Sequence, residues 1–224
     1  MDSAGVKYVV NPYDEFALEE AIRRKEEAGE GTVTAIALGP VESVESLRQA
    51  LAMGADEGVL LSCDGSHDSL VVARALAAEI EGRDFDLVLF GKQAIDDDNM
   101  QVPQMVAELL EIPCATVVVG LEITDRHVTA RREVEGGHEV LEFSLPAVVS
   151  AQKGLNEPRY PSLKGIMAAK KKPLEEKQVA LEASTLELVS LEEPPAPAAG
   201  RIVGEGVDAI PDLVRALREE AGVL

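Results

Sequence analysis

Short apolar runs alternate with amphipathic helical segments through the first two-thirds of this 224-residue chain, and that alternation constrains its fold most. The runs at residues 32–38, 59–61 and 87–90 are apolar at nearly every position, as in strands covered on both faces. Helical patterns separate these runs, and the connections between them are short. The pattern predicts an α/β fold with a doubly wound, mostly parallel sheet of the Rossmann type.

The pattern changes after Pro113, where β-type sequence takes over. Further strands are predicted at residues 117–119, 128–134, 140–145 and 147–150. Gly136-Gly137 indicates a hairpin turn between the second and third of them. The Pro-rich stretch at 194–197 indicates a stiff spacer, and a final helix is predicted from near Pro211.

These changes predict three regions. Residues 1–152 form an α/β nucleotide-binding domain with a β-hairpin insertion. Residues 153–177 form a basic loop, because seven Lys or Arg residues stand there against three glutamates. Residues 178–224 form an extended C-terminal arm with an amphipathic terminal helix, whose apolar side needs a surface to lie on.

Charge excludes several classes of function. Lys and Arg number 21 against 41 Asp and Glu, so the net charge of -20 repels phosphate backbones and anionic lipid surfaces. No apolar run is long enough to cross a bilayer, and no signal peptide is recognised at the N-terminus. The two cysteines, Cys63 and Cys114, are distant and favour buried free thiols in a reducing compartment. We therefore expect no nucleic-acid binding, no membrane insertion, and a cytoplasmic or organelle-matrix location.

The loop at residues 91–99 follows the third predicted strand and leads into a helix, the place where open parallel sheets bind ligands. N–H groups at a helix start favour a phosphate, and Asn99 and Gln101 add side-chain donors. Gly91 permits close backbone approach, and carboxylates can accept ribose hydroxyls. Three adjacent aspartates do not suit an anion unless they face solvent or bind backbone amides. An acidic, solvated helix start therefore remains the alternative.

Metal binding and catalysis by side chains find no support in the pattern. Asp96, Asp97 and Asp98 are consecutive, whereas calcium loops alternate their ligands. His67, His127 and His138 are scattered without metal-ligand spacing. No Gly-x-Gly-x-x-Gly, Walker loop or nucleophile–base arrangement is recognised. We predict no metal site, no catalytic residues and no enzyme activity of the chain's own.

Five segments in one order resemble the beta subunits of electron transfer flavoproteins. They are residues 11–21, 50–56, 91–98, 132–149 and 155–160, and the resemblance covers roughly residues 5–175. It implies an adenine-nucleotide hydrolase-like fold in a heterodimer with an alpha subunit. Such proteins accept electrons from acyl-CoA dehydrogenases, as in fatty acid beta-oxidation, and pass them to a quinone-linked oxidoreductase.

The resemblance further implies two cofactors: FAD, held mainly by the alpha subunit, and an AMP buried in the beta subunit. By position, the AMP-binding residues are Asn11, Pro12, Tyr13, Asp14, Leu38, Gly91, Lys92, Gln93, Ala94, Ile95, Asp96, Asp97, Asp98, Asn99, Met100, Gln101 and Val102. Met100 and Val102 replace polar residues of some members, so these two can offer only backbone N–H groups. Tyr13 falls where the family has an aromatic residue beside the flavin.

The basic region also acquires a role from the resemblance. Leu163 occupies the place of an exposed leucine that enters a hydrophobic pocket on the dehydrogenase, with Ile166 and Met167 beside it. A small apolar contact of this kind dissociates fast, as an electron shuttle requires. Lys170 and Lys171, together with Lys172, are expected to steer the partner electrostatically.

The chain departs from the family pattern at its start. Members begin with a strand and loop ahead of the position of Asn11, whereas only ten residues precede it here. Either the start of the chain is truncated or misassigned, or the sheet lacks a central strand; we expect the version without that strand to be less stable by itself than a complete one. Three alternatives stay open: a bifurcating-type subunit with a second FAD in the AMP site, an adenine-nucleotide hydrolase or ligase, and a nucleotide-sensing module.

Overall fold

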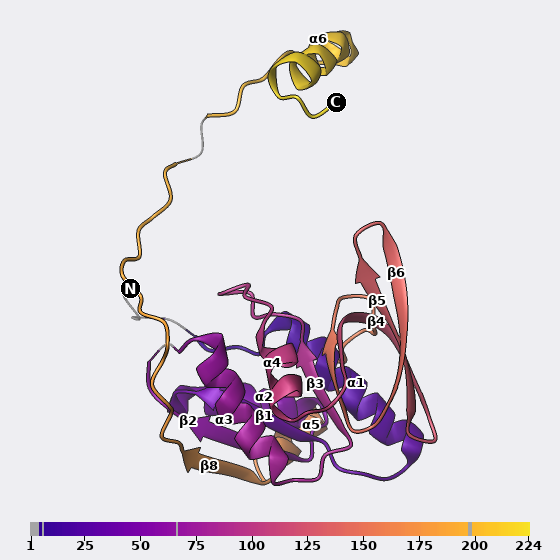
Figure 1. Ribbon diagram of the computed structural model, residues 1–224, viewed down its shortest axis with the longest axis vertical. Coiled ribbons are helices and arrows are strands. Elements are labelled where there is room, and N and C mark those ends of the chain that lie inside the picture. The colour runs from indigo at the N-terminus through magenta and orange to yellow at the C-terminus, as the bar shows by residue number, and fades with distance from the viewer. Residues whose placement is uncertain (1–4, 6, 66, 197–198) are drawn as a thin grey trace. The chain divides into compact units, whose positions relative to one another are not determined.

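The computed structural model describes residues 5, 7–65, 67–196 and 199–224 (Figure 1). The chain divides into two units, Met1–Leu186 and Glu187–Leu224. The helices of the first unit are α1 (Pro12–Ala28), α2 (Val44–Met53), α3 (Ser69–Glu81), α4 (Val102–Leu109) and α5 (Leu163–Ala169). Its strands are β1 (Thr34–Gly39), β2 (Glu57–Ser62), β3 (Leu87–Gly91), β4 (Cys114–Thr124), β5 (His127–Val134), β6 (Gly137–Ser144), β7 (Ala147–Ala151) and β8 (Leu174–Gln178). The α/β class expected from the alternating pattern is confirmed.

The strands form two hydrogen-bonded sheets. β1, β2 and β8 are parallel in the order β1-β2-β8. The second sheet has the order β3-β7-β4-β5-β6, in which β3, β7 and β4 are parallel and β5 and β6 are antiparallel additions. Strand pairing is therefore mostly parallel in the part of the chain nearest the helices.

The described strands form two separate ladders rather than one. β1 ends one ladder and β3 begins the other, and no described strand pairs with the outer edge of either. All six residues of β1 are only partly buried although they read Thr-Ala-Ile-Ala-Leu-Gly. Among the described residues, β1 and β3 are therefore both edge strands, and no backbone ladder joins the two sheets.

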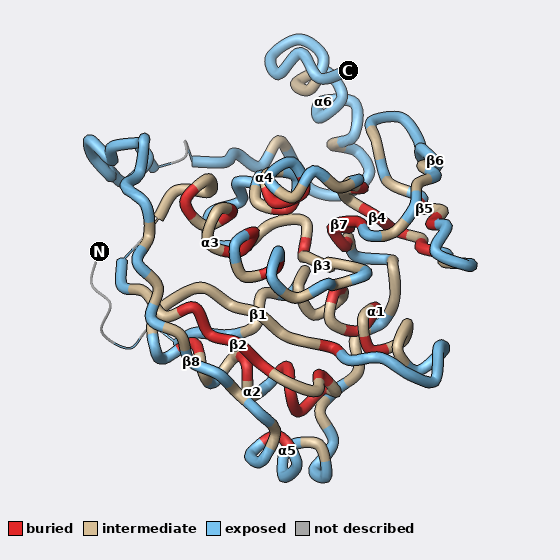
Figure 2. Tube along the Cα trace, turned by 60° about the horizontal axis from the view of Figure 1, so that its bottom comes forward, coloured by how far each residue is buried: buried red, intermediate tan, exposed pale blue. Residues whose placement is uncertain are grey.

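Side-chain packing joins the two sheets where hydrogen bonds do not. One apolar cluster contains Val59 and Leu61 of β2 together with Val148 of β7, and Ile36 of β1 and Phe90 of β3 pack against it. Helices α3 and α4 supply the rest of this cluster. The two sheets therefore share one core beneath α3 and α4 (Figure 2).

The opposite faces carry different partners, as the period of two along a strand requires. Ala35 of β1 packs with Leu51 and Ala52 of α2 rather than with α3. In β3, Leu87 and Leu89 turn to a cluster built from β4, β5 and Val149 of β7. Helices α1 and α2 therefore lie on the face of the domain opposite α3 and α4 (Figure 1).

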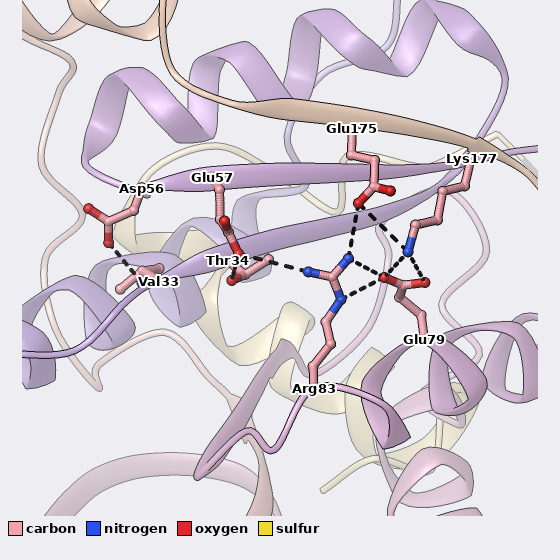
Figure 3. Close-up of polar contacts among 8 residues, drawn as sticks. All are labelled: Val33, Thr34, Asp56, Glu57, Glu79, Arg83, Glu175 and Lys177. Carbon is pink, nitrogen blue, oxygen red and sulfur yellow. Dashed lines mark hydrogen bonds and ion pairs between the residues drawn. The ribbon is translucent and has the colours of Figure 1, made fainter.

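The region predicted as a basic loop at 153–177 contains two regular elements, α5 and β8. Ser162 caps α5 by accepting the N–H of Gly165 at 3.0 Å. β8 reads Leu-Glu-Glu-Lys-Gln, so its charges concealed it from the apolar pattern. An ion-pair network stabilises it from the helix side, where Glu79 of α3 accepts bonds from Lys177 (Figure 3). Arg83 joins the same network through Glu79 and Glu175.

The second unit is small. It holds a short 3-10 turn at Val207–Ala209, α6 (Ile210–Arg215) and a π-helical turn at Ala216–Glu220. The helix begins beside Pro211, as predicted from the first-turn proline. Ile210, Leu213 and Val214 remain exposed within this unit, at 53%, 44% and 37%. Its apolar side therefore has no cover within its own unit.

Candidate functional site

The start of α1 meets the end of β3 through Asp14. The Asp14 carboxylate accepts the N–H of Gly91 at 2.6 Å and a bond from the Asn11 side chain at 2.8 Å. Burial raises the pKa of Asp14, and these two hydrogen bonds oppose that rise without cancelling it. A Cβ added to Gly91 would lie 2.7 Å from the backbone N of Asp14 and the carbonyl carbon of Tyr13. Only glycine therefore allows this close approach of two backbones.

Asn11 ties the loop after β3 to the same helix. Its side-chain amide donates to the carbonyl of Gln93 at 2.8 Å, and its side-chain oxygen accepts the N–H of Ile95 at 3.3 Å. Although Asn11 occupies the N-cap position of α1, its side chain does not cap that helix. Asn11 instead forms hydrogen bonds with the backbone of a loop more than eighty positions away in the sequence. Together with Asp14 it makes a polar clamp at the end of β3.

Tyr13 and Lys92 form the third contact between these segments. The Lys92 ammonium lies 4.8 Å from the centre of the Tyr13 ring, within cation–π range. This arrangement places one positive charge at the mouth of an otherwise acidic loop. The structure therefore brings together the predicted residues Asn11, Tyr13 and Asp14 with Gly91 to Ile95.

Two of the three aspartates bind groups within the loop. Asp97 accepts the backbone N–H and the side-chain amide of Asn99, both at 3.1 Å. Asp98 accepts a bond from the Gln93 side chain, while its own N–H donates to Ala94 O at 3.0 Å. Asp97 and Asp98 therefore bind donors of the loop itself and help to determine its shape.

The loop backbone adopts a conformation that suits close approach of a ligand. Asp98 and Met100 both have positive φ angles of 52°. Alternation of left- and right-handed residues can turn successive N–H groups toward one side, as in anion-binding loops. Gln101 and Val102 follow at the start of α4, and Leu38 lies near the end of β1. Leu38 packs on the core shared by the two sheets.

The predicted docking residues lie together on α5. Leu163 is 84% exposed, Met167 63% and Ile166 44%, a large apolar surface for so short a helix. Lys170 and Lys171 follow and are exposed. Lys172 differs from them: its ammonium binds the carbonyls of Leu51 and Ala55, so the steering role expected for it does not fit.

The segment before α5 is attached to α1 by buried polar contacts that the sequence pattern did not predict. Glu19 and Glu20 of α1 are 4% and 1% exposed. Arg159 binds Glu19 through its guanidinium and its backbone N–H, and Asn156 donates to Glu20 at 3.0 Å. Glu26 adds a second carboxylate for Arg159, whose pKa these acids raise. The sequence signal for this pairing was Arg159 in the segment Asn-Glu-Pro-Arg, together with the adjacent acidic residues Glu19 and Glu20 on a predicted helix.

Among residues 5, 7–65, 67–196 and 199–224, no three His, Cys, Asp or Glu side chains group as metal ligands would. Within the same part of the chain, no helix has the length and apolar character needed to cross a membrane. Cys63 and Cys114 are both free and half-buried; burial is the main cause that raises the pKa of each thiol, for Cys114 to about 11.

Fold and loop together define an α/β protein with a clamped polar loop at the carboxyl end of a parallel strand. Residues 1–182 match the model of the electron transfer flavoprotein domain. The electron transfer flavoprotein subunit beta of Bacillus subtilis is 44% identical over 98% of this chain and 90% of its own length. The Syntrophomonas wolfei and Sus scrofa proteins of the same name are 45% and 44% identical, over 88% and 96% of this chain and 78% and 86% of their own lengths.

The chain therefore belongs to the electron transfer flavoprotein family, among its beta subunits. Its role is that of a subunit of an electron transfer flavoprotein.

Proposed function

We propose that this chain is the AMP-holding beta subunit of a heterodimeric electron transfer flavoprotein, working beside an FAD-carrying alpha subunit. The observation that carries the proposal is the clamp at the end of β3, in which Asn11 and Asp14 bind the backbone of the loop that begins at Gly91. A scaffold that organises backbone N–H groups in this way suits a permanently held nucleotide.

The residues present fit an adenine nucleotide. Gln101 and the backbone N–H groups at the start of α4 would hold its phosphate, and the Lys92 ammonium adds a positive charge nearby. Asp96, the loop aspartate whose role is open, would accept a ribose hydroxyl. Ala94 and the backbone beside Leu38 would line the base. In this reading the nucleotide is structural, and its phosphate completes a loop that carries acidic side chains.

FAD would supply the electron-carrying chemistry, bound mainly to the alpha subunit. This chain would contribute Tyr13, one ring face of which faces the Lys92 ammonium. Leu163, Ile166 and Met167 of α5 would contact an acyl-CoA dehydrogenase, and a quinone-linked oxidoreductase would accept the electrons. The exposed apolar side of α6 would pack on the alpha subunit. The assembly would work in the bacterial cytoplasm or in an organelle matrix.

Co-expression with a candidate alpha subunit tests the proposal. The purified yellow complex is extracted with acid and the released small molecules are identified by mass spectrometry. FAD together with AMP is the expected result. A second FAD in place of AMP would assign the chain to the bifurcating type. A complex without any adenine monophosphate or second flavin, or a chain that remains monomeric beside the alpha subunit, would contradict the proposal.

A further inference from the structure

Helix α5 carries the proposed docking residues, yet it has only seven residues, too few to be stable by itself. It packs against α2, and the contact is close. Ala169, 3% exposed, belongs to one apolar cluster with Leu51 and Ala52 of α2. A Cβ placed on Gly165 would overlap the carbonyl oxygen of Ala52. The glycine therefore lets α5 approach the backbone of α2 directly.

Two basic side chains bind the ends of these helices in a reciprocal way. Arg48 of α2 donates from one guanidinium nitrogen to Ala169 O, the last carbonyl of α5, at 2.7 Å and to Lys172 O, three residues further on, at 2.8 Å. Lys172 in turn donates to Leu51 O in the last turn of α2 at 3.0 Å and to Ala55 O just after that helix. Each helix thus receives a cation from its neighbour at its negative C-terminus.

This reciprocal capping leaves the outer side of α5 free. Arg48 and Lys172 are half-buried, whereas Leu163, Met167, Lys170 and Lys171 are exposed. Four basic residues in and after α5 therefore divide into two kinds: Lys164, Lys170 and Lys171 face solvent, and Lys172 binds protein carbonyls. The position and orientation of the apolar surface depend on contacts that no docked partner would touch.

We propose that Arg48, Lys172 and Gly165 are positioning residues for docking: they hold α5 as a preformed, rigid surface on α2. This inference rests on the proposed function, because it concerns how the docking surface named there is presented. A preformed surface avoids the ordering cost of folding α5 on each encounter. Loss of the contacts that hold α5 on α2 therefore weakens binding to the dehydrogenase without changing any side chain that makes the docking contact.

The test uses the full heterodimer with a purified acyl-CoA dehydrogenase and its acyl-CoA substrate. Arg48→Ala, Lys172→Met and Gly165→Ala are compared with Leu163→Ala and with Arg74→Ala. Arg74 lies on α3, and its replacement removes a guanidinium from an exposed ion pair with Glu182. Initial rates at varied heterodimer concentration separate KM from kcat. We expect Arg48→Ala, Lys172→Met and Gly165→Ala each to raise the KM for the heterodimer roughly threefold to tenfold. The same variants should keep kcat and FAD content, and Arg74→Ala should match the wild type.

Further readouts separate positioning from general instability. Arg48→Lys should have a KM between those of Arg48→Ala and the wild type, since one guanidinium nitrogen of Arg48 makes both bonds to carbonyls. Trypsin should cut after Lys170 or Lys171 faster in Arg48→Ala than in the wild type. The double variant Arg48→Ala/Leu163→Ala should raise KM by less than the product of the single effects.

Two outcomes would count against the claims separately. If Leu163→Ala raises KM while Arg48→Ala and Gly165→Ala leave it unchanged, the positioning inference is wrong and the docking surface stands. If Leu163→Ala itself leaves KM unchanged, the proposed docking surface is wrong.

Discussion

The Asp14 carboxylate accepts the backbone N–H of Gly91 at 2.6 Å, joining the first turn of α1 to the last residue of β3. The bond joins residues separated by 77 positions and determines where the loop after β3 begins. It also requires two backbones to approach closely, since Cβ space at Gly91 is filled by the backbone of residues 13 and 14.

Gly91→Ala should therefore damage the site more than its size suggests. The added methyl group would force α1 away from β3, and we expect a loss of about 2–4 kcal/mol in the free energy of unfolding together with loss of bound nucleotide. Urea unfolding and nucleotide extraction measure the two effects. Gly82→Ala is the matched control, because a Cβ there meets no atom within 4 Å. Equal behaviour of the two variants would refute this account.

Asn11→Ala should release the loop from α1. The loss of the bonds to Gln93 O and Ile95 N should speed amide exchange across residues 93–95 and lower nucleotide content by roughly tenfold. Asn11→Asp should be worse, because it removes the donor and adds a charge beside Asp14, whose pKa burial already raises. Hydrogen exchange followed by mass spectrometry provides the measurement. An Asp variant that binds nucleotide better than the Ala variant would contradict the assignment.

Glu79→Gln should change how stability depends on pH. Burial raises the pKa of Glu79, but hydrogen bonds from Lys177 and Arg83 outweigh burial and hold that pKa below its ordinary 4.5. A carboxyl with a lowered folded-state pKa stabilises the protein above pH 4.5, and this contribution is lost as pH falls through the folded-state value. We expect the variant to be about 1–3 kcal/mol less stable at pH 7, with the difference shrinking below pH 4.5.

Denaturant unfolding from pH 7 down to pH 3.5 measures this difference. Glu81→Gln on the same helix is the control, since Glu81 is exposed. A constant difference between Glu79→Gln and the wild type at every pH would show that the network in Figure 3 acts by packing rather than by charge.

Val117→Gly should cost little. Val117 has a φ of 60° within β4, where the ladder with β5 and β7 is irregular, and its N–H donates to the Ser150 hydroxyl at 3.0 Å. A β-branched residue in this conformation is strained by about 1–2 kcal/mol, which glycine relieves. We expect unfolding free energy within about 1 kcal/mol of the wild type. Val118→Gly, at a fully buried neighbour, should lose about 3 kcal/mol. Similar losses for both would refute the strain.

Periodic apolar segments predicted most of this fold, because their burial depends on local pattern. Local signals of this kind also end and begin helices: Asp68 caps α3 by accepting the N–H groups of Leu70 and Val71. β8 was not predicted because its stability comes from pairing with β2 and from ion pairs with side chains of α3. Neither interaction can be recognised from the five residues of the strand itself.

For the candidate site, the sequence located the two segments but not the bonds between them. Asn11 and Gly91 were both expected, yet the clamp depends on tertiary geometry. The pairing of Glu20 with Asn156 was not expected, because a glutamate normally lies at the surface. Long-range polar pairs of this kind need coordinates, since either partner alone reads as an ordinary solvated side chain.

The interrupted ladder between β1 and β3 has a mechanical consequence. Among the described residues no backbone hydrogen bond joins β1 to β3, so apolar side chains connect the two halves of the core there, and these slide more easily than a hydrogen-bonded register. A ligand held at the carboxyl ends of β1 and β3 would connect the two sheets across this boundary. Its departure should then soften the whole α/β unit, so that loading with ligand and mechanical integrity of the chain rise and fall together.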